Sequence, residues 1–561
     1  MLFDNPVLPG FNPDPSIICV EDVYYMAVST FEWFPGIKLY RSHDLAHWEQ
    51  CGYALTRADQ LDLSGVATAQ GVWAPCLTYN AQQKRFYLSF SVMFSMKEQH
   101  FDLNNYYVTS DDIEGEWSDA RYLNSSGFDP SFFHDDNGQI WVTNLEWESR
   151  QGYQHPGRII VQEFDPQQQR LTGPVFNLGY GGTQRGCAEG PHIYKRQGYY
   201  YLMTAEGGTG YGHAVVMQRS RSVTGPYQSD PQHVVLTSHP EEFDELGDDE
   251  SVKLHRFDPN RILQKSGHGC LVETPQGESY VVHLCARPLL PSPYCTLGRE
   301  TAIQHCRWSD DGWLRLASGG IEAQLQIDLP VAQRLPILPY KVGRENFSAP
   351  RLPHDYQSYR LPLDSSVLQT GADGLTLRGQ GSLFSGRHLS LIARRLNHFH
   401  ADIETELSFT PQHYFDSAGL TLYYCADNFI YLRVYYSEAV QQVCVGVTTS
   451  IGGKKTEHKA YRSPISNPQQ LKLRVQVRHD KATLHFAEQG HALQQIGEAF
   501  SMETLSDEYG YQKFTGTFVG MFCEDYHRQQ NRARFHYLDY LPVEEKARNN
   551  KAQNELLTVV S

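Results

Sequence analysis

The chain alternates between short apolar runs and polar turns, and five of these units resemble one another. In each, a polar or aromatic residue beside a proline or small residue is followed by an apolar strand, a turn, and a second strand rich in aromatic and branched residues. This pattern predicts β-hairpins. The spacings between unit starts are 59, 56, 60 and 79 residues, and the starts are Asp14, Trp73, Asp129, Glu189 and His268. A hairpin repeat of this period predicts an all-β fold with a five-bladed β-propeller over 1–325.

A different pattern follows this repeat. Residues 326–345 contain several prolines and are expected to form a linker. Beyond them, apolar and polar residues alternate, as in "ADIETELSF" from Ala401 and "LKLRVQVR" from Leu471. Such strands have one buried and one wet face, which predicts a β-sandwich over 346–543. Residues 544–561 are expected to be a tail, as a short helix or a frayed end.

The composition narrows the choice of ligand. Aromatic residues make up 12% of the chain, with 34 Tyr and 27 Phe, which suits a β-rich protein with surfaces that stack on sugars. The net charge is −16 and no basic run occurs, so nucleic acid and anionic membrane are not expected as partners. No stretch approaches the ~18 apolar residues of a membrane span. A neutral or cationic ligand fits this balance.

The N-terminus and the cysteines predict a cytoplasmic protein. The opening "MLFDNPVLPG" lacks the charged and apolar segments of a signal peptide. The 11 cysteines are odd in number, scattered, and without a CxxC pair, so we expect reduced and mostly buried thiols. Nucleotide-binding, zinc-protease and serine-hydrolase motifs are not found.

Three of the unit starts are carboxylic acids. The first strand of each propeller blade lines the central channel, so Asp14, Asp129 and Glu189 are expected to converge at one mouth of that channel. Each acid alone also fits a turn or a strand cap, as Asp14 between two prolines does. Together, neighbouring carboxylates raise one another's pKa. A protonated carboxyl beside an ionised one is what glycoside hydrolysis needs.

Three blocks of the chain resemble the signatures of glycoside hydrolase family 43. They are "NPDPS", "FDPSFFHDDNGQIW" and "EGPHIYKRQGYYYLMTAEGGTGYGH", and nearly the whole chain resembles the two-domain β-xylosidases of that family. The resemblance implies that Asp14 is the general base that activates water. It implies that Asp129 tunes its neighbour's pKa and holds the sugar, and that Glu189 is the general acid. It also implies inversion of the anomeric centre by a single displacement.

The same resemblance implies a set of substrate-binding residues. "LGRETAIQ" is similar to the block whose arginine, here Arg299, reaches into the sugar subsite; a surface salt bridge is the alternative. Phe31 in "STFEWFPG" and Trp73 in "VWAP" resemble the aromatic walls of the pocket. A position in the core is the alternative for both.

Two further residues are assigned by resemblance. In related xylosidases a phenylalanine of the second domain closes the pocket; Phe514 in "KFTGTFVG" is the candidate, Phe518 the second choice, and a core role the alternative. His268 resembles a channel histidine that in some relatives helps to hold a calcium-centred water cluster. Calcium prefers oxygen ligands, so a hydrogen-bonded channel histidine is equally consistent. No cofactor is required for the chemistry.

We therefore expect an exo-acting β-1,4-xylosidase that releases xylose from the non-reducing ends of short xylo-oligosaccharides such as xylobiose. The second domain should turn the funnel into a pocket. A homo-oligomer, either a dimer or a tetramer, is expected. One alternative is an α-L-arabinofuranosidase, as a side or main activity, and another is a non-catalytic sugar-binding propeller. A retaining fructan hydrolase is disfavoured because the opening block is NPDPS rather than NDPNG.

Overall fold

Five four-stranded antiparallel sheets form the N-terminal part of the chain. The computed structural model describes residues 2–97, 99–153, 157–240, 252–329, 338–509 and 513–543, so the predicted tail at 544–561 lies outside the described residues. The first two sheets consist of β2 (Ser16–Val20), β3 (Val23–Val28), β5 (Gly36–Ser42) and β6 (Glu49–Leu55), and of β7 (Gly71–Asn80), β8 (Arg85–Lys97), β9 (His100–Ser110) and β10 (Arg121–Asn124). The third consists of β11 (Ser131–His134), β12 (Ile140–Trp147), β13 (Gly157–Asp165) and β14 (Arg170–Gly179). The last two consist of β15 (Glu189–Arg196), β16 (Tyr199–Glu206), β17 (Ala214–Ser220) and β18 (Gln228–Thr237), and of β19 (Gln264–Glu273), β20 (Ser279–Ala286), β21 (Glu300–Trp308) and β22 (Leu314–Leu316).

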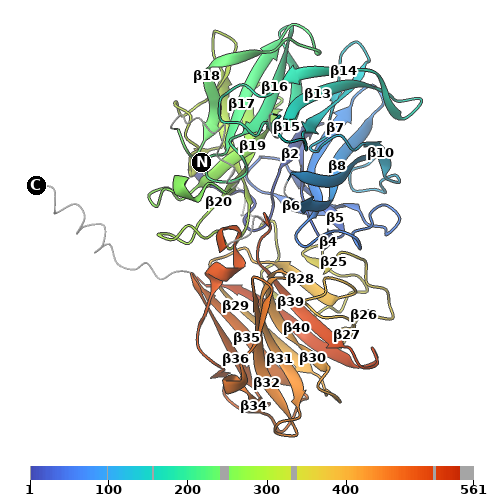
Figure 1. The fold of residues 1–561 in the computed structure, drawn as a ribbon, viewed down its shortest axis with the longest axis vertical. Helices are drawn as coiled ribbons and strands as arrows, with labels where there is room; N and C mark the ends of the chain where they lie inside the picture. Colours follow the sequence, from blue (N-terminus) through green and yellow to red (C-terminus); the bar gives the residue numbers. More distant parts are fainter. Residues whose placement is uncertain are drawn as a thin grey trace, which may run out of the picture.

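The five sheets are the blades of a propeller. The first strand of each blade contacts the first strands of both neighbours, in the closed ring β2, β7, β11, β15, β19 and back to β2. The terminal strands β1 (Leu2–Asp4) and β23 (Gln326–Asp328) pair with each other outside the blades. The predicted five-bladed propeller is confirmed, with the first strands of the blades around its channel (Figure 1).

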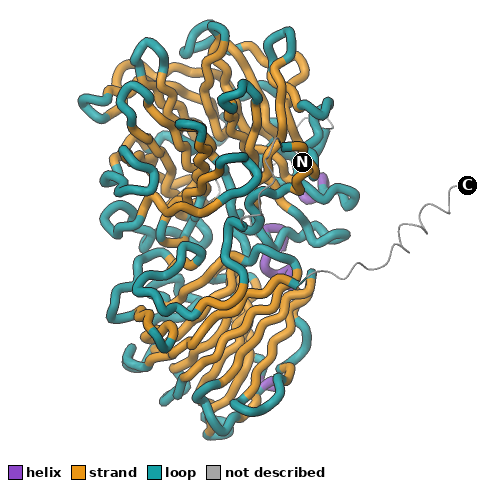
Figure 2. The backbone as a smooth tube through the Cα atoms, turned by 180° about the vertical axis from the view of Figure 1, so that it is seen from behind, coloured by secondary structure: helices purple, strands orange, loops and turns teal. Residues whose placement is uncertain are grey.

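Two nine-stranded sheets form the second domain, which lies below the propeller in Figure 1. The first contains β24 (Gly343–Glu345), β26 (Leu368–Gly371), β27 (Gly374–Arg378), β29 (His400–Ser408), β35 (Leu471–Arg478), β36 (Lys481–Ala487), β37 (Gln494–Gln495), β38 (Phe500–Ser501) and β40 (Arg532–Pro542). The second contains β4 (Trp33–Phe34), β25 (Tyr356–Tyr359), β28 (Ser390–Arg395), β30 (Asp416–Cys425), β31 (Asn428–Ser437), β32 (Gln442–Ile451), β33 (Lys454–Glu457), β34 (Ser463–Pro464) and β39 (Phe518–Asp525). The described helices are all short 3-10 turns (Figure 2): η1 (Leu254–Arg256), η2 (Lys459–Tyr461), η3 (Met502–Leu505) and η4 (Asp507–Tyr509).

The alternation predicted for the sandwich strands is present in β35. Its four aliphatic side chains, from Leu471 to Val477, are buried and the residues between them are exposed or half-buried. In β29 the pattern is broken at Glu404, which was expected on the wet face and is buried instead. Its carboxylate accepts hydrogen bonds from Arg474 and Tyr537, each 2.8 Å long, and these partners offset the loss of water.

The two domains share a β-sheet. Strand β4 belongs to the propeller in sequence, but it pairs with β25 at the edge of the second sandwich sheet, where the domains meet in Figure 1. The Trp33 ring of β4 stacks on Phe518 of β39 with centroids 3.9 Å apart. Next to it, Glu32 and Arg360 form a buried ion pair of 2.6 Å. The predicted linker, 326–345, carries β23 on the propeller side and β24 on the sandwich side.

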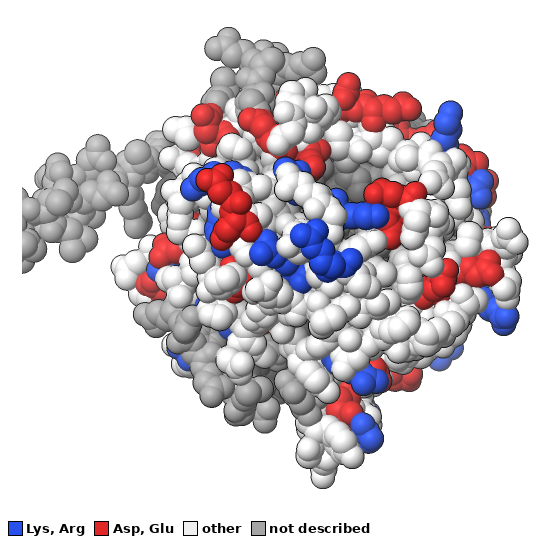
Figure 3. Space-filling model, turned by 90° about the horizontal axis from the view of Figure 1, so that it is seen from above, with Lys and Arg blue, Asp and Glu red and all other residues white. Residues whose placement is uncertain are grey.

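The surface and the described helices add two observations. The end of the propeller seen in Figure 3 carries Lys and Arg side chains interspersed with Asp and Glu, so on that face no large area has a single sign. Within the described ranges, every helix is too short and too polar to cross a membrane. Eight of the eleven cysteines are buried.

Candidate active site

The five inner strands share one backbone feature at the mouth of the channel. A residue with left-handed φ occurs once per blade in this region: Asp14 (54°), Ala74 (39°), Asp129 (57°), Gly190 (55°) and His268 (48°). Such φ values are uncommon for residues other than glycine, so their recurrence marks a common kink in the repeat. The predicted unit starts Asp14, Asp129 and His268 lie at this kink. The other two, Trp73 and Glu189, lie one residue before the kinks at Ala74 and Gly190.

Asp14 is held by a short hydrogen-bond chain. The Ala74 N–H donates to Ser29 Oγ at 2.8 Å, and the Ser29 hydroxyl donates to Asp14 Oδ2 at 2.6 Å. Because Ser29 Oγ already accepts one hydrogen, its own proton is directed to the carboxylate. The other oxygen, Asp14 Oδ1, lies 3.8 Å from His268 Nδ1. Asp14 is partly exposed, so a water molecule can reach a carboxylate that is already oriented.

Asp129 is hydrogen-bonded to the neighbouring blade, which carries Glu189. Its Oδ2 accepts a 2.9 Å hydrogen bond from the Gly190 N–H, which belongs to the residue directly after Glu189. The pKa of Asp129 is raised to about 6, chiefly by burial; His268 acts against this rise, and the negative charge of Asp14 adds to it. Asp129 is therefore coupled to both of the other acids, since the charge of Asp14 acts on it and its own charge acts on Glu189.

Glu189 is the carboxyl that retains its proton most strongly. Burial raises its pKa well above the ordinary value, and the charges of Asp129 and Asp14 raise it further, while Arg299 lowers it. A carboxyl in this state can donate a proton at neutral pH. Its neighbour Asp14 is oriented to accept one, so the mouth of the channel contains an acid and a base.

Arg299 is fixed by the second domain. Its side chain is 2% exposed, and its Nη1 forms a 2.6 Å ion pair with Asp507 Oδ2 in η4. Its Nη2 donates to the Thr209 carbonyl at 2.7 Å, and its Cζ lies 4.4 Å from the centre of the Phe514 ring. The Nε–H is buried and has no hydrogen-bond partner among the described residues. The salt bridge expected as the alternative exists, but it is buried and joins the two domains.

The predicted aromatic residues lie in one cluster. Phe31 and Trp73 have ring centroids 5.9 Å apart, and both belong to the apolar cluster that also includes Phe514. Trp73 and Phe514 are half-buried, whereas Phe518 is fully buried under Trp33. Phe514 therefore borders Arg299, and Phe518 is part of the core between the domains.

Two glycines allow the sandwich to approach the propeller at this point. A Cβ atom on Gly298 would lie 2.7 Å from the Thr515 carbonyl oxygen, and one on Gly516 would lie 2.7 Å from the Leu297 carbonyl oxygen. Both distances are too short for any side chain. The glycine of "LGRE" and the glycine of "FTGT" thus bring Phe514 beside Arg299.

His268 stands between Asp14 and the backbone of Gly190. A Cβ atom at Gly190 would be 3.0 Å from His268 Nε2, so the imidazole is packed directly against this strand. Among the described residues, no group of three or more His, Cys, Asp or Glu side chains is arranged to hold a metal ion. A single imidazole does not supply the oxygen ligands that calcium prefers, so the side chains present do not form a calcium site by themselves.

Sequence reasoning did not identify Asp507, Ser29 or Thr209. Ser29 and Thr209 are small polar residues in strand-rich regions, and nothing in their surroundings separates them from ordinary surface positions. Asp507 and Glu508 are two adjacent acids shortly before "KFTGTFVG", a pattern that also fits a solvated turn. Their role depends on contacts with a domain about 200 residues away in the chain, Glu508 accepting from the Cys295 N–H at 2.9 Å.

Comparisons with known proteins agree with this geometry. Residues 3–314 match the model of the glycosyl hydrolases family 43, and residues 344–541 match the beta xylosidase C-terminal concanavalin A-like domain. The chain is 42% identical to "Xylosidase/arabinosidase 43B" of Humicola insolens (96% of this chain, 98% of the relative) and 36% identical to "Xylan 1,3-beta-xylosidase" of a Vibrio species (96% and 98%). A solved xylan beta-1,4-xylosidase from Bacillus halodurans C-125 superposes with a TM-score of 0.89 at 41% identity, over 96% of this chain and all of that one. The protein therefore belongs to glycoside hydrolase family 43 and combines its catalytic propeller with the concanavalin A-like sandwich.

Proposed function

We propose that the protein is an exo-acting, inverting β-xylosidase that releases xylose from the non-reducing ends of short xylo-oligosaccharides. The observation that carries this proposal is the arrangement of Glu189, Asp14 and Arg299. A carboxyl with a strongly raised pKa, an oriented carboxylate and a buried guanidinium with a free donor lie at one channel mouth. The three relatives reported above all have xylosidase in their names, which supports the same substrate class.

Each of the three carboxyls has a different role in the reaction. Glu189 donates its proton to the glycosidic oxygen, and the bond between that oxygen and the anomeric carbon breaks. Asp14 accepts a proton from the water molecule that attacks the anomeric carbon from the opposite face. Asp129 keeps Glu189 protonated until this step, because its charge raises the pKa of Glu189. Exchange of protons with solvent afterwards restores Glu189 and Asp14.

The second domain favours action on chain ends. Phe514 and the Asp507–Arg299 pair bring the sandwich to the edge of the site, which leaves less room for a chain that would continue in both directions. The Nε–H of Arg299 is suited to a sugar hydroxyl, and the rings of Phe31 and Trp73 are suited to the apolar face of a pentose. Xylobiose is therefore the substrate that we expect to be hydrolysed best.

Two related activities are kept as second candidates. The Humicola relative is named for both xylosidase and arabinosidase activity, so an α-L-arabinofuranosidase side activity is proposed here as well. The Vibrio relative is named a 1,3-xylosidase, so the linkage must be tested rather than assumed. A non-catalytic sugar-binding propeller is disfavoured by the coupling of three carboxyls at the channel mouth.

The test is a comparison of four substrates with one product analysis. We expect kcat/KM to be highest for β-1,4-xylobiose, lower for β-1,3-xylobiose, and measurable for aryl β-xyloside and aryl α-L-arabinofuranoside. Proton NMR in the first minutes should show α-xylose from each β-xyloside. Early β-xylose would overturn the inverting assignment. A complete lack of hydrolysis with retained sugar binding would favour the binding module.

The calcium proposal is tested separately. If a calcium-centred water cluster rests on His268, exhaustive chelation lowers activity, added calcium restores it, and His268→Ala removes this response. Indifference to chelation would leave His268 as a hydrogen-bonded channel residue beside Asp14. The expected homo-oligomer and the cytoplasmic location also stay predictions, the first of which light scattering coupled to size exclusion would test.

A further inference from the structure

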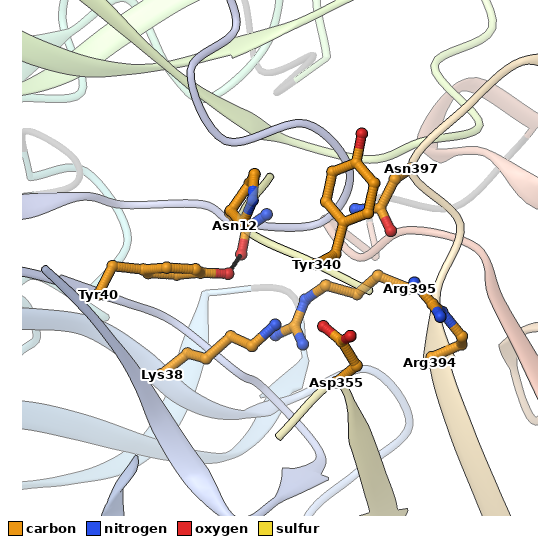
Figure 4. Close-up of a pocket in the computed structure, with 9 residues that line it drawn as sticks. Asn12, Lys38, Tyr40, Tyr340, Asp355, Arg394, Arg395 and Asn397 are labelled. Atoms are coloured by element: carbon orange, nitrogen blue, oxygen red, sulfur yellow. Dashed lines mark hydrogen bonds between the residues drawn. The ribbon is translucent and has the colours of Figure 1, made fainter. Parts of the chain in front are cut away.

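A cluster of buried cations lies at the interface between the domains. Lys38 of β5 is 3% exposed, and Arg394 and Arg395 at the end of β28 are each 2% exposed. All three line one small enclosed space (Figure 4). Lys38 enters this space from the propeller and the two arginines from the sandwich, so the space is part of the domain contact.

The positive charge in this space is not balanced. Its lining contains one carboxylate, Asp355, which is half-buried. In the part of the chain that the structure describes, none of the three cations has a carboxylate oxygen within the 4.0 Å of an ion pair. Other buried cations of this interface and its surroundings do have such partners: Arg299 with Asp507, Arg360 with Glu32, and Arg287 with Glu300.

Several donors in the space also lack hydrogen bonds. Arg394 Nε and Arg395 Nη2 have no partner among the described residues, and no hydrogen bond of Lys38 Nζ is formed with that part of the chain. The neighbouring amide groups are already occupied. The Asn12 and Asn397 side chains both donate to the Pro9 carbonyl, at 3.0 and 2.7 Å.

Unbalanced buried charge requires a physical explanation. An isolated ion in a low-dielectric interior is costly unless a counter-charge or a shift in protonation offsets it. Burial lowers the pKa of Lys38 well below its ordinary value, with Arg395 and Arg394 lowering it further and Asp355 opposing them. Either Lys38 is neutral in the folded protein, or an anion from solution balances the cluster. The two arginines remain charged in both cases.

We propose that this space binds one small monovalent anion of the size of chloride, held by Lys38, Arg394 and Arg395. The region open to the centre of a water-sized particle is ≈ 10 Å³, which is about the room that one water molecule needs. Sulfate, phosphate and organic carboxylates are larger than this space. Chloride exceeds water by a few tenths of an ångström in radius, so the flexible Lys38 side chain must move outward by about that much to admit it. It needs donors without a fixed geometry, as an ammonium and two guanidinium edges provide.

The bound anion would join the two domains next to the loop that carries Asp14. Arg395 also donates from Nε to the Phe11 carbonyl and from Nη1 to Gln357 at 2.6 Å. Phe11 is three residues before Asp14 in the same loop. The anion would thus hold Lys38 of the propeller and Arg395 of the sandwich together and would stabilise the interface against which this loop packs.

The test is the anion dependence of thermal unfolding of the full-length protein. At constant ionic strength, chloride replaces gluconate stepwise, and Tm is measured at each step. Because a ligand bound by the folded state stabilises it in proportion to the logarithm of its concentration, we expect Tm to rise by roughly 2–4 °C over the series. Sulfate at the same ionic strength should not reproduce the rise beyond its general effect on an unrelated protein.

Two lysine variants provide the matched comparison. Lys38→Met keeps most of the side-chain volume and removes the charge, so the chloride response should disappear. Lys454→Met removes an exposed lysine from β33 and should leave the response intact. A chloride response that persists in Lys38→Met, or that is absent in the unaltered protein, would overturn the proposal and support a neutral Lys38 beside water.

A crystallographic measurement covers the case in which Lys38→Met does not fold. Crystals of the unaltered protein grown in bromide should show an anomalous peak between Lys38 and Arg395. Electron density that scatters as water, with no anomalous signal there, would overturn the proposal. Neither measurement involves the hydrolytic reaction, so the result is independent of the proposed function.

Discussion

The propeller and the sandwich contribute to the site in different ways. Glu189 is the first residue of the inner propeller strand β15, and Asp14 and Asp129 lie two residues before the inner strands β2 and β11, so their coupling follows from the repeat itself. The sandwich contributes binding and positioning groups. It contributes Phe514, which lies against the Arg299 guanidinium, and Asp507, which pairs with it. The chemistry is therefore a property of one domain, and the shape of the pocket is a property of the contact between two.

This difference has a consequence for kinetics. Changes in the propeller acids should alter the chemical step and depend on the leaving group or on pH. Changes in the sandwich residues should act on substrate binding and on the contact between the domains, and they should not depend on the leaving group. The predictions that follow use these signatures to separate the two contributions.

The largest effects are expected for the two propeller acids. Glu189→Gln should lower kcat/KM on xylobiose by roughly 100- to 10,000-fold, because the leaving sugar loses its general acid. An aryl xyloside with an activated leaving group departs without a proton and should be affected much less. Asp14→Asn removes the base and should damage both substrates similarly. Steady-state kinetics on both substrates check this; a Glu189→Gln loss that is equal on both would mean that the acid has been assigned wrongly.

A smaller effect is expected from the sandwich residue Asp507. Asp507→Asn keeps the size of the side chain but removes the charge that pairs with Arg299. We expect KM for xylobiose to rise roughly tenfold with a smaller change in kcat, since a misplaced guanidinium loses a charge-assisted hydrogen bond of about 1.5–3 kcal/mol. The loss should be the same for xylobiose and the aryl xyloside.

The control for Asp507 is Tyr424→Phe. The Tyr424 hydroxyl also donates to Asp507, through the other carboxylate oxygen, but does not contact Arg299. A purely structural role of this buried group would make the two variants alike in KM and in thermal stability. Retained KM in Tyr424→Phe, together with raised KM in Asp507→Asn, would assign the effect to the position of Arg299.

The sequence was more informative about the propeller than about the contact between the domains. The hairpin repeat is local, and a period of hairpins can be recognised without knowing what each strand touches. It placed the blades and directed attention to three acids, although it aligned Trp73 and Glu189 one residue away from the kinks at Ala74 and Gly190. That error arose because φ is not visible in a pattern of apolar and polar residues.

The domain contact could not be predicted in the same way. Strand β4 is two residues of a propeller segment that pair with β25 more than 300 residues later, and such a short segment has no period. Asp507 and Glu508 resemble a solvated turn in sequence. Glu404 was expected to be exposed, and its burial depends on Arg474 and Tyr537 from other strands. In each case the deciding partner is distant in the chain.

Two phenylalanines of the same segment differ in their expected roles, one at the edge of the site and one in the core between the domains. Phe514 is half-buried beside Arg299, so Phe514→Ala should lower kcat/KM on xylobiose about tenfold, or about 1.4 kcal/mol, and leave Tm nearly unchanged. Phe518 is fully buried against Trp33, so Phe518→Ala should destabilise the protein by about 3–5 kcal/mol. Kinetics and denaturant unfolding of both variants test this. A large stability loss in Phe514→Ala would place that residue in the core instead.

The smallest expected effect is a shift in the pH profile, and it has opposite signs for two residues. Glu189 acts as an acid, so kcat/KM on xylobiose falls as the pH rises through the pKa of Glu189. The charge of Asp129 raises this pKa and Arg299 lowers it. Asp129 has a pKa of about 6, so it is ionised above that pH, and its charge then acts on Glu189. Asp129→Asn should therefore move the alkaline limb to lower pH, and Arg299→Met should move it to higher pH.

The control for these shifts is the activated aryl xyloside. Its hydrolysis does not need the proton of Glu189, so the alkaline limb seen with xylobiose should be weak or absent in the unaltered enzyme and in both variants. The absolute rates of Asp129→Asn and Arg299→Met will also fall, because both residues are proposed to hold the sugar. A lower rate by itself does not change the pH at which the alkaline limb of the profile lies. Shifts of the same sign in the two variants would mean that the limb reports a group other than Glu189. Opposite shifts that occur with xylobiose but not with the aryl xyloside would show that Asp129 raises the pKa of Glu189. They would also show that Arg299, which the sandwich holds in place, lowers it.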